Sequence, residues 1–111
     1  MIVCTDGGQD TVQPGEPRGG CKKRLSLYAE HKAYQAATAD PKSPNYIKKI
    51  SAGPMVNDED TMMRGSAFVV QVSSREEAET FYKNDPFYVN KVWESVICNR
   101  YTVVGGTLPS L

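Results

Sequence analysis

The sequence has little cysteine, and its three cysteines, Cys4, Cys21 and Cys98, stand far apart with no CxxC pair. A zinc site needs clustered cysteine and histidine ligands, and the chain has one histidine, so the sequence predicts no metal site. An odd number of cysteines also argues against a disulfide framework, so we expect free thiols in a reducing compartment. Long apolar runs are absent too, since no segment approaches the roughly 20 residues of a membrane span.

An excess of charge of either sign is also missing. The chain has 13 Lys and Arg against 13 Asp and Glu, so its formal net charge is zero. Nucleic acids and anionic membranes are bound by basic surfaces, so neither is expected as a partner. The first ten residues, MIVCTDGGQD, lack the basic and apolar regions of a signal peptide. Together with the free thiols, this predicts a cytoplasmic protein.

The length and composition that are present predict one globular domain over residues 1–111. The chain is 40% hydrophobic and 23% charged, which is ordinary for a folded protein. Residues 7–20 are rich in glycine and proline and are predicted to form a loop, and residues 105–111 a tail. A domain this short buries only part of its surface, so pairing with a second copy is expected.

The pattern of apolar and turn-forming residues predicts the element order β-α-β-β-α-β. The predicted strands and helices are residues 1–5 (strand), 21–39 (helix), 46–55 (strand), 66–73 (strand), 74–84 (helix) and 95–104 (strand), with a helical turn at 87–93. In the first helix, apolar residues three and four apart predict one buried face: Leu25, Tyr28, Ala29, Ala33, Ala36 and Ala37. The order is that of the ferredoxin-like α+β fold, a four-stranded antiparallel sheet with both helices on one face. A second copy is the simplest cover for the other face.

Five short motifs in this order resemble the YCII (YciI-like) family. They are the R-x6-H-x2-Y helix Arg24–Tyr34, the AGP segment 52–54, Gly65-Ser66, the helix start Ser74–Ala78 and the Asp85-Pro86-Phe87 turn. The resemblance covers about residues 22–104 and implies a dimeric α+β barrel with no metal or organic cofactor. Activities assigned in the family include dehydrochlorination of a chlorinated hydroxyquinol.

The chain also departs from the family pattern close to the implied site. It has Tyr28 where members often carry a second arginine, and Lys32 where they carry leucine. The loops at 7–20 and 41–45 are longer than usual. The identity of the substrate therefore does not transfer from the family.

The resemblance implies that His31 and Asp85 form the catalytic pair. His31 is the sole histidine, and imidazole moves protons near neutral pH, but spacing alone also fits an ordinary, partly exposed helix histidine. Asp85 next to proline is equally common as a plain helix-ending turn. With the family motif, we expect the Asp85 carboxylate to orient the imidazole and raise its basicity.

Five further residues are candidates for binding the substrate. Arg24 lies two turns before His31 and would hold a carboxylate or phenolate, or would be a surface charge paired with Glu30 or Asp40. Ser66 would offer its hydroxyl or N–H to a substrate oxygen, or would only begin its strand. The remaining three are aromatic and would line a pocket or simply belong to the core: Tyr28, Tyr34 and Trp93.

Two classes of function follow from these candidates. The first is a cofactor-independent lyase or isomerase that uses a His31–Asp85 dyad on an aromatic, phenolic or polyketide-like substrate. The second is a non-catalytic dimeric module that binds a small molecule or serves as an accessory subunit. Convergence of His31 and Asp85 on a concave pocket would favour the first class, and its absence would favour the second.

Overall fold

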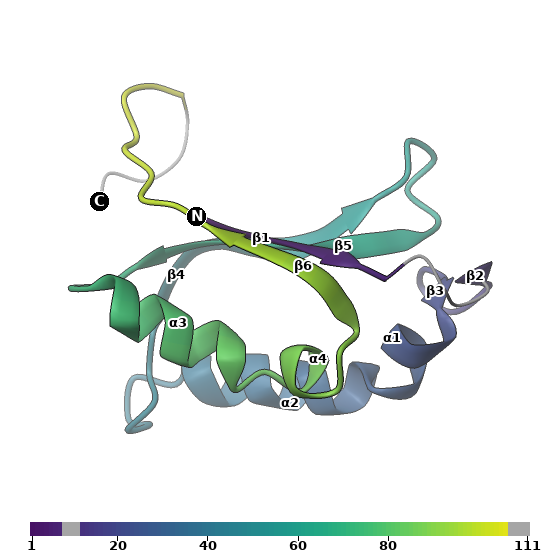
Figure 1. Cartoon of the computed structure of the whole chain (residues 1–111), viewed down its shortest axis with the longest axis horizontal. Coiled ribbons are helices and arrows are strands. Elements are labelled where there is room, and N and C mark those ends of the chain that lie inside the picture. The colour runs from purple at the N-terminus through teal and green to yellow at the C-terminus, as the bar shows by residue number, and fades with distance from the viewer. Residues whose placement is uncertain (8–11, 107–111) are drawn as a thin grey trace.

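The computed structural model describes residues 1–7 and 12–106, so residues 8–11 of the predicted loop and 107–111 of the predicted tail lie outside the described residues. Four strands form one antiparallel sheet in the order β4-β5-β1-β6: β1 (Ile2–Asp6), β4 (Lys48–Val56), β5 (Met63–Gln71) and β6 (Trp93–Cys98). Figure 1 shows the helices α2 (Tyr28–Ala39), α3 (Arg75–Lys83) and α4 (Pro86–Val89) together beneath this sheet. The ferredoxin-like order predicted from the sequence is confirmed.

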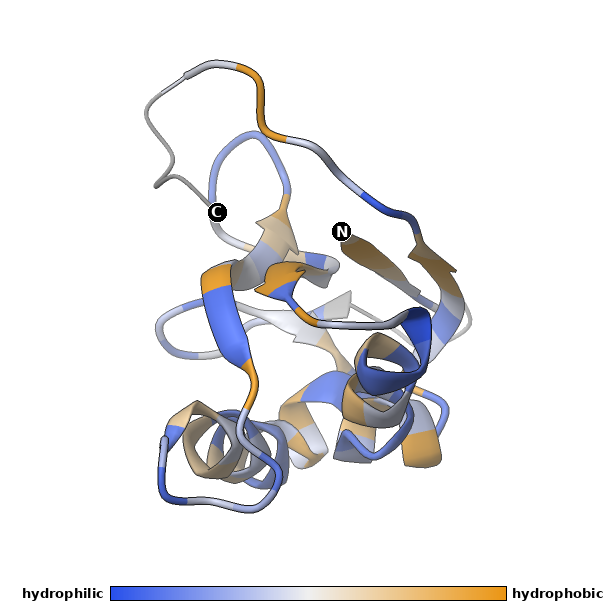
Figure 2. Cartoon of the chain, turned by 90° about the vertical axis from the view of Figure 1, so that its left-hand side faces the viewer, coloured by the Kyte–Doolittle hydropathy of each residue, from blue (hydrophilic) through white to orange (hydrophobic). Residues whose placement is uncertain are grey.

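The alternation of side chains along the strands separates a buried face from an outer face. On the helix side, Ile2, Cys4 and Phe68 are almost wholly buried, and Phe81, Phe87 and Trp93 pack around them. Viewed from the side in Figure 2, the sheet and the helices form two layers, and the strand at the N-terminus is coloured as hydrophobic. The core therefore lies between the sheet and the helices.

The outer face of the sheet carries a row of small and apolar side chains. Val3 pairs with Ala67 on one side and with Ile97 on the other, and Ala67 pairs in turn with Gly53. Ile97 is 54% exposed. None of the described helices lies over this face (Figure 1), and none is long and apolar enough to cross a membrane.

Several predicted boundaries were wrong. The first helix is divided at Leu27 into α1 (Lys22–Ser26) and α2 because Leu27 has φ −110° and ψ 7°, outside the helical region. The predicted loop contains a small ladder between β2 (Val12–Gln13) and β3 (Gly20–Cys21). The last strand ends at Cys98 and not at residue 104.

The predicted buried face of the first helix was also wrong. Ala29, Ala33, Ala36 and Ala37 are exposed, whereas His31 and Thr38 are buried. A polar side chain loses hydration on burial, and a hydrogen bond to a protein partner offsets that loss. Each inward residue has such a partner: Asp85 for His31, and the Tyr34 carbonyl for the Thr38 hydroxyl. Polar complementarity therefore sets the orientation of α2.

Candidate active site

His31 and Asp85 lie side by side, although 54 residues separate them in the sequence. The α2 helix presents His31 inward, and the turn between α3 and α4 places Asp85 beneath it. His31 Nδ1 is 2.8 Å from Asp85 Oδ1. The carboxylate also accepts hydrogen bonds from the Gln35 side-chain Nε2 and the Phe87 backbone N–H, each at 2.8 Å. Asp85 is fully buried, so these three donors replace the water it would otherwise bind.

These contacts define the tautomer of His31. An ionised carboxylate only accepts hydrogen bonds, so Nδ1 carries the hydrogen in the neutral ring and Nε2 keeps its lone pair. The imidazole also stacks on the Phe87 ring, with centroids 4.0 Å apart and planes 5° apart. His31 is thus held in one orientation with a basic nitrogen free of its carboxylate partner.

His31 lines a cavity of about 240 Å³ between α2 and the strands β4 and β5. This volume is below the range of about 300–1,000 Å³ found for drug-sized ligands, so the cavity suits a small molecule. The walls near His31 include Tyr28, Pro54, Ser66 and Phe68. Asp85 is absent from the lining, since it lies behind His31. Only the imidazole of the pair lines the cavity, so the two side chains meet each other but do not both converge on the cavity.

Arg24 is neither an exposed charge nor a partner of Glu30 or Asp40, so that alternative was wrong. Its guanidinium is 1% exposed and binds Asp6 through Nε at 2.7 Å and Nη2 at 3.2 Å. Nη2 also donates to Ser66 Oγ at 2.8 Å. Asp6 neutralises the charge of Arg24, which fixes the Ser66 side chain at the wall of the cavity.

Ser66 lies within β5, because that strand begins at Met63 and not at Ser66. The expectation of a polar first residue was therefore wrong. Ser66 is 2% exposed, and its hydroxyl oxygen accepts from Arg24 while its own hydrogen remains available to a ligand. Tyr28 lines the same cavity, beneath the ammonium of Lys32, which lies 4.9 Å from its ring centroid.

The other two predicted aromatic residues occupy different places. Tyr34 lines a neighbouring cavity, and its hydroxyl donates to the Phe81 carbonyl at 2.7 Å. Burial, with a smaller contribution from the Asp85 charge, raises the pKa of Tyr34 to about 12, so it stays a neutral phenol. Trp93 is buried in the core and meets the His31 ring edge-on at 6.2 Å. Substrate binding by Tyr34 and Trp93 stays a prediction.

Sequence reasoning missed three residues of this site: Asp6, Gln35 and Lys49. Asp6 ends β1 and has no local motif. Gln35 lies one turn after His31, so the spacing of four was a usable signal. Lys49 lies on β4, and its Nζ is 2.8 Å from both the Gln35 carbonyl and Thr38 Oγ1. Only tertiary packing brings it to the cavity.

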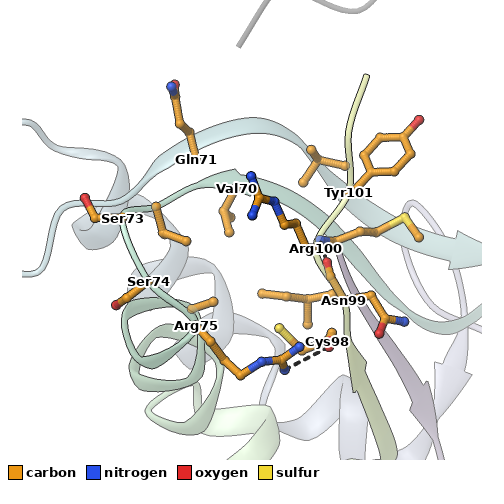
Figure 3. A pocket seen from close by; sticks show the side chains of 14 residues that line it. Val70, Gln71, Ser73, Ser74, Arg75, Cys98, Asn99, Arg100 and Tyr101 are labelled. Atoms are coloured by element: carbon orange, nitrogen blue, oxygen red, sulfur yellow. Dashed lines mark hydrogen bonds between the residues drawn. The ribbon is translucent and has the colours of Figure 1, made fainter. Parts of the chain in front are cut away.

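A larger cavity, of about 460 Å³, lies at the end of the sheet that carries the N-terminus (Figure 3). Arg75 and Arg100 border it, and Arg75 donates to the Cys98 carbonyl at 2.9 Å. Neither member of the His31–Asp85 pair lines this cavity, so it is not the candidate active site.

The buried Cys4 is a poor candidate for a nucleophile. Burial, and secondarily the charge of Asp85, raises the pKa of the Cys4 thiol to about 12, so it carries no nucleophilic thiolate at neutral pH. Within residues 1–7 and 12–106, no three His, Cys, Asp or Glu side chains are grouped so that they would hold a metal ion.

The comparisons agree with this arrangement of elements. Residues 1–101 match the model of the YCII-related domain. The chain belongs to this family. The YCII-related chain is also similar to the solved structure of 5-chloro-2-hydroxyhydroquinone dehydrochlorinase (TftG) from Burkholderia phenoliruptrix AC1100 in complex with 2,5-dihydroxybenzoquinone. The two share 26% sequence identity and a TM-score of 0.61, over 91% of this chain and 90% of the other. No curated protein matches the sequence.

The site of this YCII-related chain combines one base with a small, partly apolar cavity. An imidazole with a free Nε2 is chemically able to accept a proton and return it, and a carboxylate hydrogen-bonded to Nδ1 is able to stabilise the imidazolium formed in between. The Ser66 hydroxyl lines the same cavity, and its hydrogen is free to be donated to a ligand. The arrangement is chemically able to transfer a proton to or from a small molecule.

Proposed function

We propose that this chain is a small-molecule lyase that eliminates an acid such as HCl from a hydroquinone-like ring, with His31 as the general base and acid. The single observation that carries the proposal is His31 at the wall of the cavity, with Nδ1 2.8 Å from the buried Asp85. The similarity to a dehydrochlorinase over nine-tenths of both chains supports the type of reaction. Asp85 acts as the positioning residue.

The reaction balances without an external oxidant. When a chlorinated hydroquinone becomes a quinone, two hydroxyl protons leave and one proton adds to the carbon that bears chlorine. Chloride then departs with its bonding pair of electrons, so the ring is oxidised while the carbon–chlorine bond is reduced. His31 Nε2 would take one hydroxyl proton and deliver it to that carbon. The ring of His31, neutral again, would then take the second hydroxyl proton as chloride leaves and pass it to water, so one histidine suffices for every transfer.

The other groups at the cavity have supporting parts in this proposal. The Ser66 hydroxyl would donate to a substrate oxygen, since Arg24 already occupies its acceptor side. Tyr28, Pro54 and Phe68 offer apolar surface for the ring. Arg24 is neutralised by Asp6, so we assign it to holding Ser66 and not to binding a substrate anion.

The test is chloride release from 5-chloro-2-hydroxyhydroquinone by the purified protein. We expect one chloride per molecule of quinone formed, with a rate that saturates as the substrate concentration increases. An ion-selective electrode and the quinone absorbance measure the two products independently. Tight binding of the compound without any chloride release would instead support the non-catalytic binding module.

We further propose that two copies pair through the outer sheet face. Its central row of Gly53, Ala67, Val3 and Ile97 is small or apolar, and such rows on a sheet face are commonly covered by a partner. The resemblance to dimeric α+β barrels supports the same pairing.

Sedimentation should give twice the chain mass of 12.2 kDa for the wild type. Ile97→Asp should shift the mass to that of one chain, because an unpaired carboxylate would be buried within the interface. Val89→Asp is the matched control, since Val89 is 63% exposed on α4, on the opposite face of the sheet. A wild type that sediments as a monomer at micromolar concentration would contradict the pairing.

A further inference from the structure

The charged side chains around the His31 cavity are all basic. Arg24, Lys32 and Lys49 line it, and none of the residues lining it in the described part of the chain is acidic. Asp6 lies behind Arg24 and neutralises it through two hydrogen bonds. The cavity therefore presents two lysine charges that no lining carboxylate balances.

Of these two lysines, Lys49 is the one held in place. Lys49 is half-buried on β4, and its ammonium donates to the Gln35 carbonyl and to Thr38 Oγ1, each at 2.8 Å. The ammonium also lies 5.3 Å from the centroid of the Phe81 ring. All three partners are neutral. An ammonium has three N–H groups, so one remains after these two hydrogen bonds.

The surroundings of Lys49 disfavour its charge. Burial lowers the pKa of the Lys49 ammonium, and the more distant charge of Asp85 only partly opposes this effect. An anion placed next to the ammonium would supply the missing counter-charge. Lys32 differs, because it is exposed and rests on Tyr28.

We propose that Lys49 is a specificity-determining residue that binds an anionic group, a carboxylate or ionised hydroxyl, on the aromatic ligand of the His31 cavity. The inference rests on the proposed function because both place a single-ring ligand against His31. It adds that the preferred ligands carry a negative charge on the part of the ring that faces β4.

Two compounds that differ only in this charge provide the test. 2,5-Dihydroxybenzoate and 2,5-dihydroxybenzamide share the ring and both hydroxyls, but only the first is anionic. We expect isothermal titration to show that the wild type binds the benzoate about tenfold more tightly, as for one charge-assisted hydrogen bond of about 1.4 kcal/mol. Lys49→Met should remove this ratio, and Lys49→Arg should retain most of it.

Lys48→Met is the matched control, since Lys48 is the exposed neighbour on the same strand. The ratio of the two affinities separates charge recognition from a loss of stability, because a loss of stability would weaken the binding of both compounds equally. If the wild type binds both compounds equally, or if Lys32→Met and not Lys49→Met removes the ratio, the proposal for Lys49 is overturned.

The outcome also separates this proposal from the reaction proposed above. If the ratio depends on Lys49 but no chloride is released from the chlorinated hydroquinone, then Lys49 recognition stands and the lyase reaction is overturned. If chloride is released but neither benzoate nor benzamide binds, the lyase reaction stands and the role of Lys49 is overturned.

Discussion

His31→Gln should lower kcat for chloride release by about 10²–10⁴-fold, the usual contribution of a positioned general acid–base group. Glutamine is close to histidine in size, and its amide N–H still reaches a carboxylate. Its side chain does not accept and return a proton near neutral pH, however. The loss should therefore fall on kcat, with a small change in KM, because ring binding depends on the cavity walls.

Two further variants show whether this loss is specific. Glu30→Gln alters the neighbouring exposed residue of α2 and should leave the rate unchanged. Asp85→Asn should lower kcat by a smaller factor and shift the pH profile, since Asp85 acts only through His31 and does not line the cavity. Circular dichroism checks that each variant is folded. A folded His31→Gln protein with the full rate would refute the role of the histidine.

The second large effect concerns stability. Asp6→Asn should lower the free energy of unfolding by about 3–5 kcal/mol, because it leaves the Arg24 charge buried without a counter-charge. The Arg24 and Asp6 side chains are only 1% and 6% exposed, so water does not replace the lost partner. Urea denaturation followed by tryptophan fluorescence measures the change, and Trp93 is the single tryptophan.

The chain offers a matched exposed pair. Arg18 and Asp60 also form a charged hydrogen bond, at 2.6 Å, but their side chains are 32% and 58% exposed. Asp60→Asn should therefore change stability little, because water screens that pair. The double variant Asp6→Asn with Arg24→Met should recover part of the loss, since it removes the unpaired cation as well. Equal effects of Asp6→Asn and Asp60→Asn would show that burial does not matter at Arg24.

The order of elements was predictable because each strand and helix has its own local signal. The segment from Phe68 to Val72, which is rich in valine, and the serine cap before Arg75 are of this kind. Ser74 does cap α3 by accepting from the Glu77 N–H. The ends of elements were less predictable. The last strand stops at Cys98, directly before the polar pair Asn99-Arg100, although the residues from Tyr101 to Val104 again favour a strand.

The site was predictable in part, and only through a family motif. His31 and Asp85 are adjacent in the structure, but their spacing in the sequence carries no physical signal. The sequence suggested the wrong inward face for the first helix, since alanines outnumber large apolar residues there. Arg24, His31 and Thr38 turn inward instead, because each forms a hydrogen bond there. Their partners lie on β1, in the α3–α4 turn and on β4, respectively. The tertiary fold brings those partners close, and no local sequence pattern predicts which residues they are.

The position of Asp85 also affects how relatives of this protein are interpreted. Its Oδ1 accepts the backbone N–H of Phe87 and so caps α4, in addition to facing His31. An aspartate at this kind of cap stabilises the chain by about 0.5–2 kcal/mol whether or not any reaction occurs. Selection for folding alone would therefore retain it in relatives that have lost catalysis. If His31 is the base proposed above, then in a survey of such relatives the histidine would separate enzymes from non-enzymes, and the aspartate would not.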